Sequence, residues 1–143
     1  MNMSVSVNEI VNDLYALQQE RRMRFFRFLH DAAFLDGDLR AIFQRIVEEA
    51  DSCSRELKAW VYEPGESQAG MIFNSWAKVP LFITGTKKEI LAECANNELR
   101  IMNIYSAILG ANAVTPEIAR VMDDQYYRIN SLHDHIQLYH DAQ

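Results

Sequence analysis

Hydrophobic positions recur every three or four residues along four long stretches of this chain, and that spacing is the period of an amphipathic α-helix. The stretches cover about residues 7–34, 38–62, 87–110 and 116–140. No stretch alternates apolar and polar residues as a half-buried strand does. The sequence therefore predicts an all-α fold, a four-helix bundle in which each helix buries one apolar stripe. Typical stripe positions are Leu14, Leu17, Phe25, Phe43, Ile46, Leu57, Leu91, Met102, Tyr105, Met122, Ile129 and Leu132.

Local signals mark where these helices begin. Ser6 with Glu9 and Thr86 with Glu89 match the capping box, in which each side chain bonds the other residue's backbone amide. Thr115 is a typical residue to cap the last helix. Short turns join the first helix to the second and the third to the fourth, so each pair is predicted to be an antiparallel hairpin.

The stretch between the two hairpins is dense in apolar residues and is predicted to form a short crossover helix over 70–83, interrupted near its end by Pro80. It carries more apolar surface than one short helix easily buries, and such an excess often becomes an interface. We therefore expect a homo-oligomer that associates around Trp76; packing wholly within the chain is the alternative. Residues 1–143 form one domain in either case.

Three polar residues interrupt the apolar stripes at positions that the helical period assigns to the core. Arg21 lies between Leu17 and Phe25, Glu98 between Ala95 and Met102, and Gln125 between Met122 and Ile129. Folding the hairpins back places all three within about one turn of a common level. A buried ion is costly unless it is paired, so Arg21 and Glu98 are predicted to compensate each other in a polar core layer that Gln125 joins. A functional pocket and a misjudged helix phase are the alternatives.

Composition narrows the classes of function. The 14 basic and 20 acidic residues give a formal net charge of −6, which disfavours a nucleic-acid partner. Neither a leader-like segment nor an apolar run long enough to cross a membrane is present, so a cytoplasmic protein without a membrane partner is expected. Cys53 and Cys94 lie on apolar stripes and are expected to be inert core residues.

Scattered motifs add a resemblance. The run Ile90–Cys94 followed by Glu98, Trp76 in the crossover, and His133, Asp134 and Ile136 near the end of the chain resemble a bacterial family of ferritin-like four-helix-bundle domains of unknown function. The resemblance implies a ferritin-like topology with a long connection between the helical pairs. It also implies rubrerythrin-like and bacterioferritin-like relatives that bind two metals.

A carboxylate-bridged metal centre is the familiar use of such a bundle, and the sequence argues against it. A di-iron centre takes a Glu from each of two helices and Glu-x-x-His from the other two, but no Glu here has a His three residues later. Arg21 would also bring a positive charge into the layer where two cations should lie. The alternative is a degenerate site for iron or another divalent metal, built from Glu20, Glu49, Glu98 and His133.

The histidines offer few other candidate sites. Counting back from the turn, His133 lies near the level of Glu93, and the two are expected to form a structural pair rather than a catalytic one. We therefore predict an uncharacterised ferritin-like bundle that self-associates and acts as a non-enzymatic binding or stress-related accessory protein without a cofactor. The alternative is a metal-binding ferritin-like oxidoreductase or metal-storage protein.

Overall fold

The computed structural model describes residues 6–31, 35–61 and 85–143. Within these ranges every regular element is helical, which confirms the all-α prediction. No helix in this part of the chain is long and apolar enough to cross a membrane. The elements are α1 (Val7–Asp31), α2 (Gly37–Leu57), the 3₁₀ turn η1 (Lys58–Trp60), α4 (Lys87–Gly110) and α5 (Pro116–Asp141).

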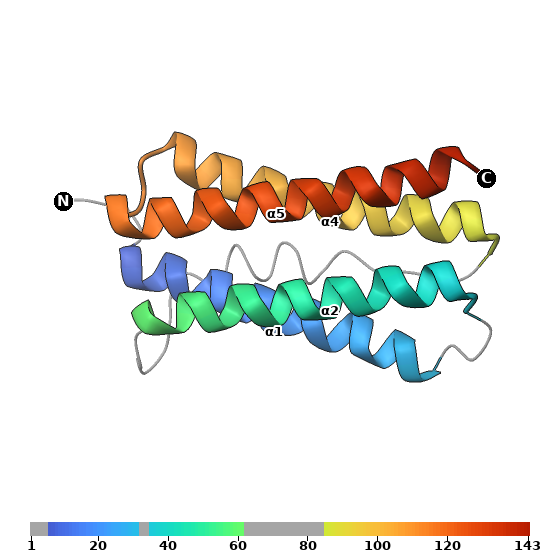
Figure 1. Ribbon diagram of the computed structural model, residues 1–143. Helices are drawn as coiled ribbons and strands as arrows, with labels where there is room; N and C mark the ends of the chain where they lie inside the picture. The colour runs from blue at the N-terminus through green and yellow to red at the C-terminus, as the bar shows by residue number, and fades with distance from the viewer. Residues whose placement is uncertain (1–5, 32–34, 62–84) are drawn as a thin grey trace.

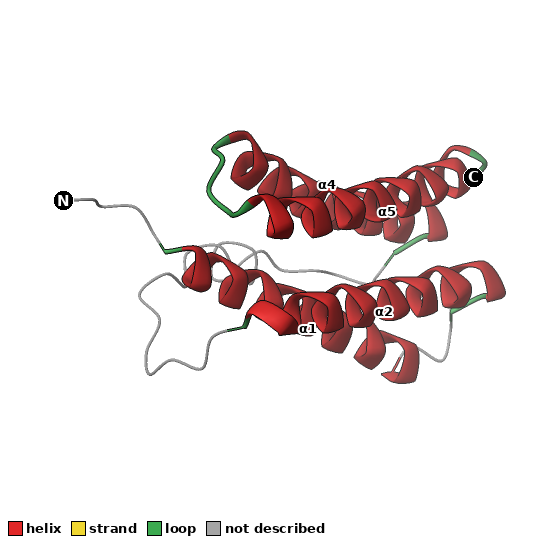
Figure 2. Ribbon diagram, turned by 60° about the vertical axis from the view of Figure 1, so that its left-hand side comes forward, coloured by secondary structure: helices red, strands yellow, loops and turns green. Residues whose placement is uncertain are grey.

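The helices form two antiparallel hairpins that lie on each other (Figures 1 and 2). Helix α1 packs along α2, and α4 packs along α5; between the hairpins, α2 packs against α5. Helices α2 and α4 run in the same direction (Figure 1). The order of helix directions is therefore forward, back, back and forward.

Side-chain caps begin the helices as the sequence predicts. Glu89 and Thr86 form a complete capping box at the start of α4. The hydroxyl of Thr115 accepts a hydrogen bond from the third amide of α5, and Asp36 does the same at the start of α2. The hydroxyl oxygen of Ser6 accepts from the amide of Glu9 at the start of α1. Each cap satisfies an amide that the helix leaves without a partner.

One helix end differs from its predicted boundary, and another predicted end lies outside the described residues. The second helix was expected to reach residue 62, but α2 ends at Leu57 and tightens into η1, because the last turn of a helix often satisfies its carbonyls with i→i+3 bonds. The first helix is described as far as Asp31, and its predicted extension to residue 34 lies outside the described residues. The crossover helix over 70–83 and association around Trp76 also lie outside them.

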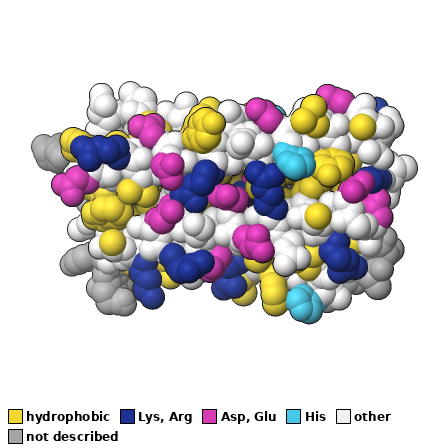
Figure 3. All heavy atoms as spheres, viewed as in Figure 1, with side chains coloured by type: hydrophobic (Ala, Val, Ile, Leu, Met, Phe, Trp, Pro, Cys, Tyr) yellow, Lys and Arg dark blue, Asp and Glu magenta, His cyan; other side chains and the backbone are white. Residues whose placement is uncertain are grey.

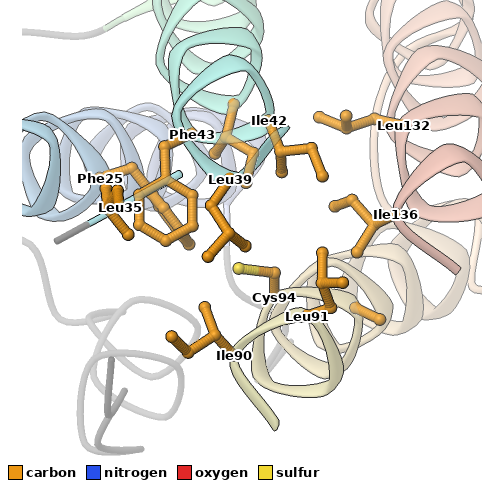
Figure 4. Close-up of a cluster of buried hydrophobic side chains, with 12 residues drawn as sticks. Phe25, Leu35, Leu39, Ile42, Phe43, Ile90, Leu91, Cys94, Leu132 and Ile136 are labelled. Carbon is orange, nitrogen blue, oxygen red and sulfur yellow. The ribbon is translucent and has the colours of Figure 1, made fainter. Parts of the chain in front are cut away.

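The apolar core consists of two clusters, one in each half of the bundle. The cluster in the half where α1 ends and α2 begins draws on all four helices. Phe25 and Phe43 are in edge-to-face contact on one side of it, and Leu91 and Ile136 lie on the other side (Figure 4). The other half is filled by residues such as Leu14, Leu57, Ile101, Tyr105 and Met122. Polar side chains occupy the interior where the two clusters adjoin.

A surface lysine ties the two hairpins together at the end of the bundle where α2 and α4 begin. The ammonium nitrogen of Lys87 lies 2.7 Å from the carboxylate of Asp38 and 3.0 Å from that of Asp36. The amide of Leu39, and after it Lys87, lower the pKa of Asp36, and Asp38 and Asp36 raise the pKa of Lys87. The first residue of α4 is thus joined to the N-cap and the first turn of α2.

Candidate functional site

A buried ion pair links α1 to α4 near the middle of the bundle. Arg21 and Glu98 are both fully buried. The Nε of Arg21 donates to one carboxylate oxygen of Glu98 at 3.3 Å, and Nη2 binds the other oxygen. Burial by itself lowers the pKa of Arg21, but the neighbouring carboxylate more than offsets this and raises it. The guanidinium of Arg21 therefore stays charged, and two of its nitrogens match the two carboxylate oxygens of Glu98.

Hydrogen bonds extend this pair across the bundle to α5. The Nη1 of Arg21 donates to the amide oxygen of Gln18 at 2.9 Å. The amide nitrogen of Gln18 donates to the hydroxyl of Tyr105, also at 2.9 Å, and that hydroxyl donates to the amide oxygen of Gln125 at 2.6 Å. All of these side chains are fully buried. We call Arg21, Glu98, Gln18, Tyr105 and Gln125 the polar layer.

The hydrogen bonds of the polar layer all donate in one direction along the chain of side chains. A guanidinium only donates, so the amide oxygen of Gln18 must face Arg21 and its nitrogen must face Tyr105. Burial raises the pKa of Tyr105, which keeps the hydroxyl protonated and able to donate onward to Gln125. The amide nitrogen of Gln125 then donates to the carbonyl of Cys53 at 3.1 Å and to Glu56 at 3.0 Å. The donation thus runs from a buried cation to a carboxylate nearer the surface.

Glu56 belongs to a partly exposed group of charges between α2 and α5. Arg128 binds Glu56 and Asp124, and its Nη1 donates to the hydroxyl of Ser52 at 3.2 Å. One carboxylate oxygen of Glu49 is buried without a hydrogen bond and lies 3.6 Å from the same nitrogen. Three carboxylates therefore surround one arginine, and the pKa of Arg128 is raised because their attraction outweighs its partial burial.

The four residues of the predicted degenerate metal site do not come together. Glu20 binds Arg24 and Arg27 on its own helix, Glu98 binds Arg21, and Glu49 lies beside Arg128. Within the described ranges no group of three or more His, Cys, Asp and Glu side chains is arranged to hold a metal ion. Each of these three carboxylates instead lies within ion-pair distance of an arginine.

His133 lies beside Asp134 and is not bonded to the predicted partner Glu93. Its Nδ1 lies 3.4 Å from the carboxylate of Asp134, the next residue in the chain. Among the described residues no hydrogen bond or ion pair joins it to Glu93. Both residues are half-buried and flank the fully buried positions Cys94 and Leu132. Counting along the helices gives a common level, but the rotation of each helix decides whether two flanking side chains meet.

Sequence reasoning located the charged pair but missed several of its partners. Gln18 was not singled out, although it lies four residues after Leu14 and three before Arg21, on the same face. Tyr105 was treated as an apolar position, because the period says nothing about where a hydroxyl points. Glu56 and Arg128 were overlooked because they sit at the edge of the core stripe, where polar residues are ordinary.

The two cysteines are buried and unpaired. Burial raises the pKa of the Cys53 thiol to about 12 and that of Cys94 well above its usual value. Both thiols therefore stay protonated at neutral pH and behave as small apolar groups. Comparisons of the chain with protein-family models, with curated proteins and with solved structures gave no match.

Proposed function

We propose that this chain is a ferritin-like four-helix bundle that works as a non-enzymatic, self-associating binding module. In this proposal the polar layer replaces the metal centre that such bundles often hold. The observation that carries it is the buried pair of Arg21 and Glu98, because a guanidinium already occupies the carboxylate that projects into the middle of the bundle.

The hydrogen bonding of the polar layer supports this interpretation. The carboxylate of Glu98 accepts from two nitrogens of Arg21, and Gln18, Tyr105 and Gln125 satisfy one another. A group that donates or accepts a proton in catalysis needs a pKa near the working pH. The pKa of Arg21 and that of Tyr105 are both raised, away from neutrality. The layer is thus suited to fixing how the two hairpins dock.

A structural layer of this kind fixes how two helical hairpins pack against each other. Apolar helix faces tolerate sliding and rotation, whereas a buried ion pair is satisfied in one arrangement only. The pair joins α1 to α4, and Gln125 joins α5 to α2. Each helix of one hairpin is thereby matched to one helix of the other, which would present a constant outer surface to a partner.

Metal analysis tests this proposal against the metal-binding alternative. Protein purified without a metal-affinity tag is incubated with ferrous iron, manganese or zinc, desalted and analysed by inductively coupled plasma mass spectrometry. We expect far less than one metal ion per chain, with no change in Glu98→Gln. The matched control is Glu117→Gln, a change at an exposed carboxylate in the first turn of α5. Near-stoichiometric metal that disappears in Glu98→Gln but persists in Glu117→Gln would overturn the proposal.

A further inference from the structure

An apolar hollow opens between α2 and α5, toward the C-terminal end of α5. It has a volume of about 110 Å³ and is lined by Ala41, Ile42 and Arg45 from α2 and by Leu132, His135 and Tyr139 from α5. Figure 3 shows this side of the molecule, with hydrophobic side chains beside a histidine in the half that carries the end of α5. A water molecule takes about 30 Å³ of liquid, so the hollow has room for one branched apolar side chain.

A ridge of two stacked rings separates this hollow from an exposed leucine. The rings of His135 and Tyr139 lie face to face with their centroids 5.1 Å apart. The Nη1 of Arg45 lies 2.7 Å from the Nδ1 of His135. On the other side of the rings, Leu138 is 71% exposed and lines a second shallow depression with Ala142. A protruding leucine and a leucine-sized hollow thus lie on opposite sides of one rigid ridge.

Charges of opposite sign lie on the two sides of the ridge, the positive one on the side of the hollow and the negative ones on the side of Leu138. Arg45 lies on the side of the hollow. Asp134, Leu138 and Asp141 are spaced by four and three residues, so they share one line along α5, and the two carboxylates are 69% and 62% exposed. Leu132, His135 and Tyr139 share the neighbouring line that faces α2. Across the surface, the hollow with Arg45 in its wall comes first, then the ridge, and then the line that holds Leu138 between its two carboxylates.

This order is self-complementary. A two-fold axis through the ridge reverses it, which brings Leu138 of one copy over the hollow of the other and its carboxylates over Arg45. Isologous interfaces require such a match, because each side presents the same residues. Within the chain, Arg45 binds His135 and Asp134 lies beside His133. Gln137 and His140 bind one carboxylate oxygen of Asp141, and Lys88 is the nearby cation.

We propose that this surface is a homodimer interface in which Leu138 of each copy fills the hollow of its partner and Arg45 pairs with the partner's Asp134 and Asp141. The inference rests on the self-association proposed above and names the surface that performs it. The ridge of His135 and Tyr139 lies on the two-fold axis. Two leucines and two sets of ion pairs are buried in each dimer.

Sedimentation equilibrium of the full chain with Leu138→Asp tests the interface. We expect dimerisation to weaken by about 100-fold or more, because each dimer loses two buried leucines and gains two buried charges. The matched control is Tyr127→Asp, since Tyr127 is equally exposed, at 71%, on the same helix three turns away, and we expect it to dimerise like the wild type. Circular dichroism establishes that both variants are folded.

Each outcome separates the two proposals. A dimer that survives Leu138→Asp overturns the interface but leaves self-association standing. A wild-type protein that stays monomeric at its highest soluble concentration overturns both. Loss of the dimer in Leu138→Asp together with its retention in Tyr127→Asp supports both.

A charge exchange tests the geometry directly. Arg45→Glu and the double variant Asp134→Arg/Asp141→Arg each place like charges across the proposed interface, so we expect each to be monomeric alone. Mixed together, they restore opposite charges at both contacts, and we expect a one-to-one heterodimer. Variants that each dimerise alone as tightly as the wild type would overturn the pairing.

Discussion

The guanidinium of Arg21 binds the carboxylate of Glu98 through two of its nitrogens, although the two residues are 77 positions apart and both are fully buried. This pair is the main polar link between α1 and α4. Two buried charges of opposite sign cost little together and a great deal apart, because removal of one leaves the other without water or a partner.

We therefore expect Arg21→Met to lower the free energy of unfolding by about 3–5 kcal/mol, since it leaves the Glu98 carboxylate buried and unpaired. The double variant Arg21→Met/Glu98→Leu removes both charges and is expected to regain most of that loss. Urea denaturation followed by circular dichroism measures both. Glu98→Leu completes the comparison. If the double variant loses as much free energy of unfolding as Arg21→Met and Glu98→Leu lose together, mutual compensation is the wrong account of the pair.

The hydroxyl of Tyr105 joins two buried amides and is expected to contribute to stability. Tyr105→Phe leaves the amide nitrogen of Gln18 and the amide oxygen of Gln125 buried without this partner, so we expect a loss of about 1–3 kcal/mol. Tyr15→Phe is the matched control, because its hydroxyl accepts from Gln19 in a part-buried position where water can replace it. Equal losses in the two variants would contradict the role given to burial.

The Asp36 carboxylate makes stability depend on acid pH. Its pKa is lowered in the folded protein, by the amide of Leu39 first and then by Lys87. A lowered folded pKa stabilises the fold above the unfolded pKa of about 3.9, and that stabilisation is lost as pH falls through the folded value. Asp36→Asn keeps a capping oxygen but removes the charge. We expect the melting temperature of this variant to fall less between pH 7 and pH 2 than that of the wild type.

The ion pairs of Lys87 predict the opposite sign at alkaline pH. The pKa of Lys87 is raised by Asp38 and Asp36, so its contribution is complete below the unfolded lysine pKa of about 10.4 and is lost as pH rises through the folded value. Lys87→Met should therefore flatten the decline of the melting temperature above pH 10. Lys88→Met, a change at the exposed neighbouring lysine, is the control and should leave the decline unaltered.

The two thiols should be unreactive in the folded protein. Burial raises the pKa of Cys53 to about 12 and that of Cys94 well above its usual value, and the thiolate is the reactive form. At pH 8 we expect Ellman's reagent to modify neither thiol in native protein and both in guanidinium chloride. Rapid modification of native Cys53→Ser or Cys94→Ser protein would identify a remaining thiol that is more accessible than the structure indicates.

Much of the candidate site could be predicted because burial of a helical position follows from local periodicity. Arg21, Glu98 and Gln125 were placed in the core by the stripe that each one interrupts, and all three are fully buried. The pair of Glu93 and His133 could not be predicted in the same way. Both residues flank the stripe, where a small change in helix rotation decides which neighbour a side chain reaches.

The sequence by itself determined the helices and where they begin, because capping hydrogen bonds and the 3.6-residue period act between residues close together in the chain. Thr86 with Glu89 is an example, since both bonds of that capping box form within one turn. Only the tertiary structure decided which polar groups meet. Gln18, Tyr105 and Gln125 come from three helices, and their hydrogen bonds depend on how the hairpins dock and on the direction in which Arg21 forces each group to donate.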